Sequence, residues 1–303
     1  MRNETIDFLL FTDDSISSEG NIRVEHMSWE GFVKHIQSFF SFTIALKSPY
    51  KICDFRPAFG ELFSDYIKDY DFWGYADIDL LFGDLRTFLT DEVLNCHDRC
   101  FFNGHISLYR NCDKMNRLWR YQEGGYPAVN YQECYSSPRA FYFDEFGAMY
   151  AKCLINDVKV YDDLELRRDP IIGLRKFFWK DQAPSSQFLV CWEEGKLYAI
   201  QDKKKIEIIY AHFFRRRFTI APKPETVHSI VIAPGEVRYN TEAKAQDMEK
   251  TESRYYRQIY FWNALKGTIK HNGIMGTIEK RRRDRDYWGY RRKLEYEHSD
   301  PQK

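Results

Sequence analysis

The chain has 303 residues, 44% of them hydrophobic, and its 45 basic residues balance its 45 acidic residues. This hydrophobic content is sufficient for a packed core, which excludes wholesale disorder, and a net charge of zero argues against a general affinity for polyanions. Seven cysteines without paired spacing argue against a secreted disulfide framework. There is no run of about 18 apolar residues, and the apolar run at residues 6–11 is too short for a signal peptide, so we expect a cytoplasmic protein.

The first 90 residues alternate between strand-like and helix-like patterns. Residues 6–11 (IDFLLF) read as a buried strand, and Ser28 reads as the N-cap of an amphipathic helix. Asp54 and Pro57 mark the start of a second helix, and residues 72–76 (FWGYA) read as a central strand. Such alternation is typical of an α/β fold with a mainly parallel sheet, whose ligands bind beyond the carboxyl ends of the strands.

Beyond residue 100 the pattern predicts shorter elements. We expect strands at residues 101–102 and 106–109, a helix at residues 113–121, and further strands between residues 188 and 212. The last group contains the turn signal Glu194–Gly195 between two apolar runs, which predicts a pair of neighbouring strands.

Two carboxylates separated by one residue, Asp77 and Asp79, follow the predicted strand at residues 72–76. Oxygen ligands suit Mg²⁺ or Mn²⁺, and such an ion stabilises the negative charge that develops on a departing diphosphate. An added imidazole ligand shifts the preference towards Mn²⁺. The same Asp-x-Asp pattern at residues 69–71 and 284–286 does not follow a strand-like run, so only Asp77 and Asp79 are predicted to bind a metal.

Residues 51–84, KICDFRPAFGELFSDYIKDYDFWGYADIDLLFGD, resemble the core of a bacterial polysaccharide-biosynthesis glycosyltransferase family. They are more distantly similar to glycogenin-like enzymes and α-1,6-mannosyltransferases. The resemblance implies a GT-A fold, Rossmann-like with a mainly parallel mixed sheet flanked by helices. It implies a catalytic, nucleotide-sugar-binding domain, which we expect over residues 1–240. The composition and apolar spacing of the tail predict a helical, basic and aromatic extension over residues 241–303.

The resemblance also implies roles for single residues. In glycogenin-like enzymes a late histidine completes the metal site and a following basic residue touches the diphosphate; His212, Arg215 and Arg216 are similar to these. The family has a glycine and a lysine after its histidine, so the choice among the arginines at 215–217 stays open. Other donor contacts are expected at strand-end loops, at the helix start near residue 54 and at the sugar-binding floor: Thr12, Asp13, Lys51, Asp54, Arg56, Asn103 and Gly104.

Adjacent carboxylates at Asp144 and Glu145 stand in a hydrophobic stretch. One of them is a candidate general base for an acceptor hydroxyl in an inverting enzyme, or a polar contact to donor or acceptor in a retaining enzyme. The likeness to glycogenin-like enzymes favours a retaining reaction. A solvent-facing acidic turn is the alternative. The expected reaction is attack by an acceptor hydroxyl on the anomeric carbon of the donor sugar.

The expected donor is a UDP-sugar, by resemblance alone, and the expected acceptor is a glycan or lipid-linked glycan of capsule or O-antigen synthesis. Residues 280–293 (KRRRDRDYWGYRRK) suit peripheral contact with the anionic inner face of the cell membrane. A structural helix is the main alternative for this tail, and a nucleic-acid groove is the weakest. Two other functions stay open for the whole chain: a metal-dependent phosphoryl or nucleotidyl transferase, and a non-catalytic assembly factor.

Overall fold

The computed structural model describes the greater part of the first 239 residues, which divide into two compact units. The described residues are 3–102, 104–122, 130–161, 170–172, 177–179, 189–201, 204–213, 219–220, 229–233 and 236–239. Of these, unit 1 takes those within 1–26, 77–93 and 162–239, and unit 2 takes those within 27–76 and 94–161. The expected boundary between residues 240 and 241, and the basic tail, lie outside the described residues.

Unit 2 contains a four-stranded sheet in the order β3–β6–β5–β7. Its strands are β3 (Phe72–Ala76), β5 (Arg99–Cys100), β6 (Ile106–Arg110) and β7 (Val160–Tyr161). The sequence predicted β3 with these bounds, but the strand lies at the edge of its sheet and not at the centre. It pairs with β6 in antiparallel register, with Ala76 opposite Ile106. The chain therefore leaves β3 at the same end of the ladder at which it enters β6.

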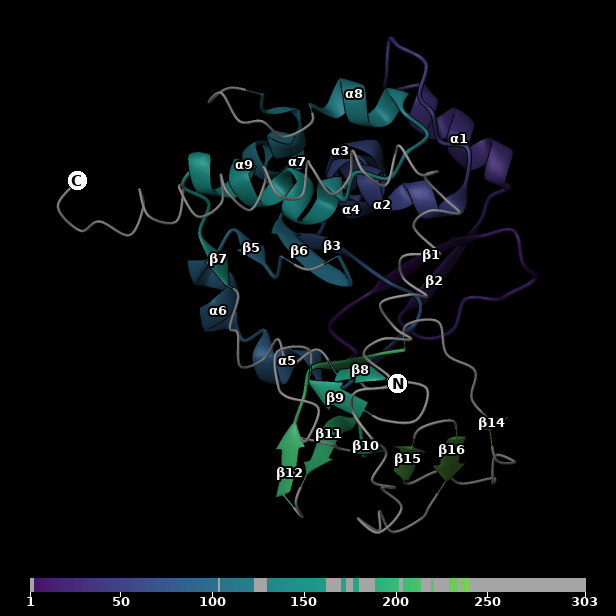
Figure 1. The fold of residues 1–303 in the computed structure, drawn as a ribbon, viewed down its shortest axis with the longest axis vertical. Coiled ribbons are helices and arrows are strands. Elements are labelled where there is room, and N and C mark those ends of the chain that lie inside the picture. The colour runs from purple at the N-terminus through teal and green to yellow at the C-terminus, as the bar shows by residue number, and fades with distance from the viewer. Residues whose placement is uncertain are drawn as a thin grey trace, which may run out of the picture. The chain divides into compact units, whose positions relative to one another are not determined.

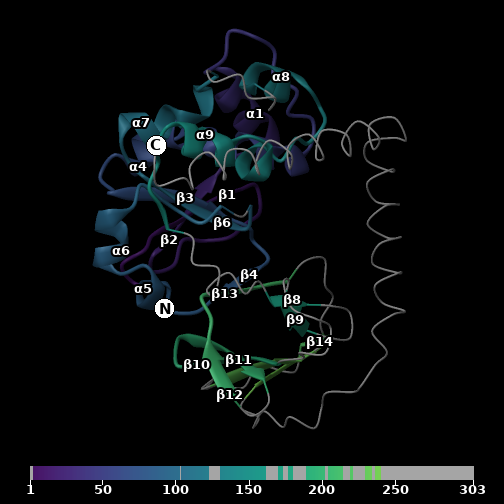
Figure 2. The ribbon, with the colours of Figure 1, turned by 60° about the vertical axis from the view of Figure 1, so that its left-hand side comes forward.

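Short helices cover this sheet. They are α1 (Trp29–Gln37), η1 (Pro49–Lys51), α2 (Ile52–Phe55), η2 (Arg56–Ala58), α3 (Phe59–Leu62), α4 (Ser64–Ile67), α6 (Asp91–Cys96, shared with unit 1), α7 (Asp113–Arg117), η3 (Leu118–Arg120), α8 (Tyr131–Ser136), the π-helical turn η4 (Phe143–Gly147) and α9 (Met149–Ile155). Figures 1 and 2 show α4, α7 and α9 on one face of β3 and β6.

Two helix predictions have different outcomes. Ser28 caps α1 as expected, because its hydroxyl oxygen accepts a hydrogen bond from the Gly31 N–H at 3.1 Å. The predicted helix from Asp54 to about residue 67 is instead broken into α2, η2, α3 and α4. Pro57 cannot donate a helical hydrogen bond, and the Asp54 side chain is engaged elsewhere, so neither residue starts a regular helix.

Aromatic side chains fill the core of unit 2. Phe55 stacks on Tyr135 at 4.1 Å between ring centroids, and Trp119 lies 5.6 Å from the same tyrosine. Trp73 of β3 stacks on Tyr109 of β6 at 4.6 Å, with their planes 8° apart. These rings are buried. Much of the aromatic content of the chain therefore serves packing in this unit.

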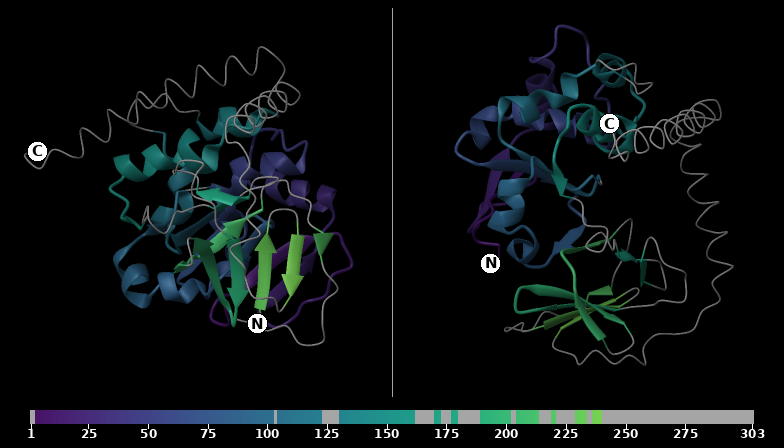
Figure 3. Two further views of the ribbon diagram at one scale, coloured as in Figure 1. Left: turned by 60° about the horizontal axis from the view of Figure 1, so that its bottom comes forward. Right: turned by 90° about the vertical axis from the view of Figure 1, so that its left-hand side faces the viewer.

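Unit 1 is rich in strands. They are β1 (Phe8–Thr12), β2 (Ile22–His26), β4 (Leu80–Phe82), β8 (Pro170–Ile172), β9 (Phe177–Trp179), β10 (Leu189–Glu193), β11 (Lys196–Gln201), β12 (Lys204–Glu207), β13 (Tyr210–His212), β14 (Thr219–Ile220), β15 (Ser229–Ala233) and β16 (Glu236–Tyr239), with one helix, α5 (Leu85–Phe88). They form the sheets β1–β2, β4–β13–β8–β9 and β12–β11–β10–β15–β16–β14. The strands of the last sheet lie side by side in Figure 3, in green.

The turn expected at Glu194–Gly195 joins β10 to β11. Glu193 pairs with Lys196, so the connection has two residues, and both have positive φ, 50° and 90°. This is the backbone of a tight hairpin turn whose twist matches that of the strands, and glycine adopts it without strain. The hairpin contributes Val190, Leu197 and Ala199 to a buried cluster with Ile208, Ala211 and Ile232.

The mixed α/β fold is confirmed, whereas the parallel character is not. Most pairings among the described strands are antiparallel; β1–β2, β5–β7, β8–β13 and β14–β16 are parallel. Short connections such as the hairpin between β10 and β11 can only join antiparallel neighbours, which explains the difference. The first predicted strand is β1, shifted to Phe8–Thr12, and its residues are half-buried. In the part of the chain that the structure describes, every helix is too short or too polar to cross a membrane.

Candidate functional site

The pairing of β4 with β13 brings together two of the predicted metal ligands, which stand far apart in the sequence. Leu80 lies opposite His212 in the antiparallel ladder, and the Phe213 N–H donates to the Asp79 carbonyl oxygen at 2.8 Å. Asp79 precedes β4 directly, so its side chain reaches the last residue of β13. Asp79 Oδ1 lies 3.5 Å from His212 Nε2.

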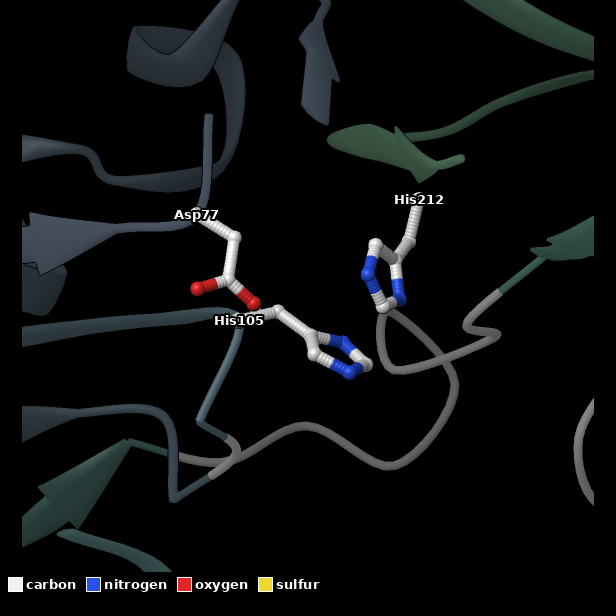
Figure 4. A group of neighbouring side chains, drawn as sticks. All are labelled: Asp77, His105 and His212. Atoms are coloured by element: carbon white, nitrogen blue, oxygen red, sulfur yellow. The ribbon is translucent and has the colours of Figure 1, made fainter. Parts of the chain in front are cut away.

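Asp77, the first carboxylate of the pair, also approaches His212 (Figure 4). One ligand atom of Asp77 lies within 4.8 Å of one ring nitrogen of His212. The His212 side chain is only 7% exposed and the Asp79 side chain is 41% exposed, so the imidazole is fixed while one carboxylate remains open to solvent. Between the carboxylates, Ile78 is 94% exposed and turns away from the interior.

Asp79 and Asp77 each approach His212, and carboxylate and imidazole groups are ligands that suit a divalent cation. Two carboxylates and one imidazole match the ligands that Mn²⁺ accepts, and Mg²⁺ would use the oxygens alone. All three residues belong to unit 1. Within this unit, each of the two predicted carboxylate ligands thus lies near the imidazole of His212.

His105, which Figure 4 also labels, belongs to unit 2 and directly precedes β6. The next residue, Ile106, pairs with Ala76 of β3. The sequence offered His105 only as part of the predicted sugar-binding floor. Sequence periodicity predicts single strands but not which strands pair, so the antiparallel pairing of β3 with β6 could not be predicted.

At the end of β1, the predicted donor contacts Thr12 and Asp13 lie in a turn at the surface. The Asp14 N–H donates to the Thr12 hydroxyl oxygen at 3.0 Å, and Asp13 between them is exposed. Both residues lie in unit 1, as do Asp77 and Asp79.

Lys51 and Asp54, predicted to contact the donor, form a buried ion pair in unit 2. Lys51 Nζ lies 2.7 Å from Asp54 Oδ2, and the side chains are 2% and 0% exposed. Lys51 also donates to the Cys134 and Arg139 carbonyl oxygens. Asp54 accepts hydrogen bonds from the backbone N–H groups of Phe141 and Phe143. The charged groups of Lys51 and Asp54 thus bind other residues in the interior of the protein.

The other predicted residues of unit 2 meet at Gly104. Arg56 Nη1 donates to the Gly104 carbonyl oxygen at 2.7 Å and lies 3.4 Å from Asp144 Oδ2. Glu145 Oε1 accepts a hydrogen bond from the Gly104 N–H at 2.9 Å. Both backbone groups of this glycine are therefore held by charged side chains that sequence reasoning had also selected.

Two buried neighbours of this group were not anticipated. Arg99, fully buried, donates to the Asp144 carbonyl oxygen and to the Ser107 hydroxyl, each at 3.2 Å. Tyr75 lies beneath Arg56, with 5.4 Å between the guanidinium carbon and the ring centroid. Burial raises the pKa of Tyr75 to about 12, so this phenol stays neutral at physiological pH. Neither residue belongs to a recognisable motif.

Asn103, Arg215 and Arg216, which the sequence assigned to the donor, lie outside the described residues.

Comparison with known proteins identifies a family whose function is unknown. A search of curated proteins found no match, and neither did a search of solved structures. Residues 1–241 match a family described as "Family of unknown function (DUF6625)". This range contains all the predicted site residues and well over half of the chain. The chain therefore belongs to the DUF6625 family of unknown function.

Proposed function

We propose that this protein is a metal-dependent glycosyltransferase with a GT-A type domain, which transfers a sugar from a UDP-sugar to a hydroxyl of a glycan or lipid-linked glycan. The observation that supports it is the approach of Asp77 and Asp79 to His212. The sequence pattern of an Asp-x-Asp pair after a strand, with a late histidine, independently predicts the same three residues. Their ligand atoms lie 3.5 Å apart for Asp79 and within 4.8 Å for Asp77.

Each residue has a distinct task in this proposal. Asp77, Asp79 and His212 hold Mn²⁺ or Mg²⁺, which supplies positive charge beside the diphosphate leaving group. The low exposure of His212 fixes one ligand, while Asp79, 41% exposed, faces solvent, from which a nucleotide would arrive. Asp144 or Glu145 receives the proton of the acceptor hydroxyl or orients a sugar hydroxyl.

The test is calorimetric titration of the full chain with UDP, with and without Mn²⁺. We expect binding that depends on Mn²⁺ and is lost in Asp79→Ala. Asp69→Ala is the matched control, because Asp69 belongs to another Asp-x-Asp, is exposed and is not one of the proposed metal ligands. If UDP, GDP and other nucleotides all fail to bind, the transferase proposal is wrong and a non-catalytic role in polysaccharide assembly takes its place.

If a nucleotide binds, analysis of the products separates the transferase from the alternative phosphoryl or nucleotidyl transferase. The proposed reaction releases nucleoside diphosphate, whereas the alternatives release pyrophosphate or nucleoside monophosphate.

A further inference from the structure

Asp54 is the central acceptor of a buried network that holds residues 141–143. The Phe141 N–H donates to its two carboxylate oxygens at 3.1 and 2.9 Å, and the Phe143 N–H donates at 2.9 Å. Lys51 Nζ balances the charge at 2.7 Å. A carboxylate with these partners fixes a backbone more firmly than a neutral acceptor would, since charge-assisted hydrogen bonds are stronger.

The backbone held in this way has an uncommon conformation. Tyr142, between the two anchored residues, is left-handed with φ 55° and ψ 44°, and Glu145 interrupts the π-helical turn with φ −103° and ψ −127°. A bulky residue with positive φ is strained and persists only where its surroundings impose it. Here Asp54 supplies that constraint from both sides of Tyr142. The path of the chain into Glu145 therefore depends on Asp54, which acts through the backbone of residues 141–143.

A second constraint acts on the carboxylate of Glu145 itself. Glu145 Oε1 accepts from the Gly104 N–H at 2.9 Å, and a Cβ on residue 104 would lie 2.2 Å from that oxygen. Only glycine leaves room for the carboxylate in this position. Gly104 is two residues from Ile106, which pairs with Ala76, the residue before Asp77. Within unit 2, Glu145 is thus anchored just before the start of β6.

The two adjacent carboxylates differ in access. Asp144 is 1% exposed, its Oδ2 lies 3.4 Å from Arg56 Nη1, and its carbonyl oxygen accepts from Arg99. Glu145 is only half-buried. Asp144 is therefore an interior anchor, and Glu145 is the member of the pair that a ligand can reach.

We propose that Glu145 is the carboxylate that meets the reacting sugar or acceptor, and that Asp54 is a positioning residue that acts through it. This inference rests on the proposed transferase function. It replaces direct contact of Asp54 with the donor by an indirect role, and it distinguishes between Asp144 and Glu145.

One test needs no substrate. Amide hydrogen exchange, followed by NMR, should become at least about tenfold faster at Gly104 in Asp54→Asn, because the Glu145 acceptor is no longer held in place. Asp54 bonds to the backbone at Phe141 and Phe143, whereas Gly104 bonds to Glu145, so transmission through residues 141–145 predicts this effect. The Gly31 amide, bonded to Ser28 Oγ, is the internal reference and should not change. Unchanged exchange at Gly104 would overturn the positioning role, whatever nucleotides the protein binds.

The second test measures UDP release from UDP-glucose, UDP-galactose and UDP-N-acetylglucosamine in the presence of Mn²⁺, beside the affinity for UDP. Glu145→Gln should bind UDP within about twofold of wild type and lower kcat by about a hundredfold or more. Asp54→Asn should lower kcat without changing the donor KM, and should cost nothing further in a Glu145→Gln background. A purely structural defect would lower kcat in that background as well.

A milder variant covers the case in which Asp54→Asn does not fold. Gly104→Ala displaces the end of a flexible side chain, so it should keep the fold and UDP binding while reproducing the kcat loss of Glu145→Gln. Gly31→Ala in α1 is its matched control and should turn over as wild type. Loss of UDP affinity in Asp54→Asn, or full activity in Glu145→Gln, would contradict the inference. Failure of the wild type to bind UDP, GDP and other nucleotides would instead contradict the proposed function.

Discussion

The Asp54 carboxylate accepts a 2.9 Å hydrogen bond from the backbone N–H of Phe143, a residue 89 positions further along the chain. The same carboxylate pairs with Lys51, and both side chains are buried. Removing one partner of a buried ion pair leaves the other charge without compensation, which costs about 3–5 kcal/mol. We expect Asp54→Asn to lower the free energy of unfolding in urea by about this amount.

The matched control is Asp91→Asn. Asp91 pairs with Arg86 at the surface, and its side chain is 83% exposed. An exposed pair contributes about 0–1 kcal/mol, so this variant should unfold almost as wild type does. Equal losses for the two variants would mean that the Lys51–Asp54 pair contributes no more than a surface contact.

Metal binding should be visible as stabilisation of the folded state. A ligand that binds only the folded protein raises its stability by about 2.7 kcal/mol at a free concentration one hundred times its Kd. We therefore expect Mn²⁺ to raise the melting temperature, EDTA to reverse the rise, and His212→Ala to abolish it. His26→Ala, an exposed histidine at the end of β2, should leave the rise intact. If Mn²⁺ still raises the melting temperature of His212→Ala, the ion binds at another site.

Lys152 predicts a specific dependence of stability on pH. The side chain is 5% exposed and donates to the Tyr121 carbonyl oxygen. Burial lowers the pKa of Lys152 from 10.5 to about 8. Between these values the unfolded chain binds the proton that the folded protein has lost, so the lysine destabilises the fold fully below pH 8 and progressively less as the pH rises to 10.5.

The measurement is the free energy of unfolding of wild type and Lys152→Gln across this pH range. Glutamine keeps an N–H donor for Tyr121 and removes the charge. The variant should be more stable at pH 7.5, by an amount of order 2–3 kcal/mol, and its advantage should disappear near pH 10.5. A difference that stays constant with pH would show that Lys152 is not desolvated.

The hairpin between β10 and β11 depends on Gly195. Its φ of 90° is a conformation that side chains other than glycine adopt only with strain. We expect Gly195→Ala to lower the free energy of unfolding by about 1–2 kcal/mol, with Gly31→Ala in α1 as the control. If Gly195→Ala lowers the free energy of unfolding no more than Gly31→Ala does, the turn can change type without cost.

Local features of the fold could be predicted well from the sequence. Ser28 before a helical apolar pattern located the start of α1, and the aromatic run at residues 72–76 located β3. The Glu194–Gly195 turn located the hairpin. Each of these signals is complete within a few residues, so no distant part of the chain is needed to interpret it.

Features that depend on distant contacts could not be predicted. A carboxylate at position 54 has the same appearance in a sequence whether it caps its own helix or holds the backbone at residue 143. The strand at residues 72–76 gives no indication that its partner is residues 106–110, or that it lies at the edge of the sheet. The Asp-x-Asp pair was selected because a strand precedes it, and the histidine was selected by resemblance alone.

The pairing of β4 with β13 also affects how the chain folds during synthesis on the ribosome. A ribosome completes Leu80–Phe82 long before it reaches Tyr210–His212, and in the described residues β13 is the strand that pairs with β4. Until then β4 presents unpaired backbone groups, and such edges invite association between nascent chains. A premature stop codon before residue 210 would release a polypeptide that carries Asp77 and Asp79 together with this open edge. We expect such fragments to be substrates for chaperones and proteases, not for the chemistry of the finished protein.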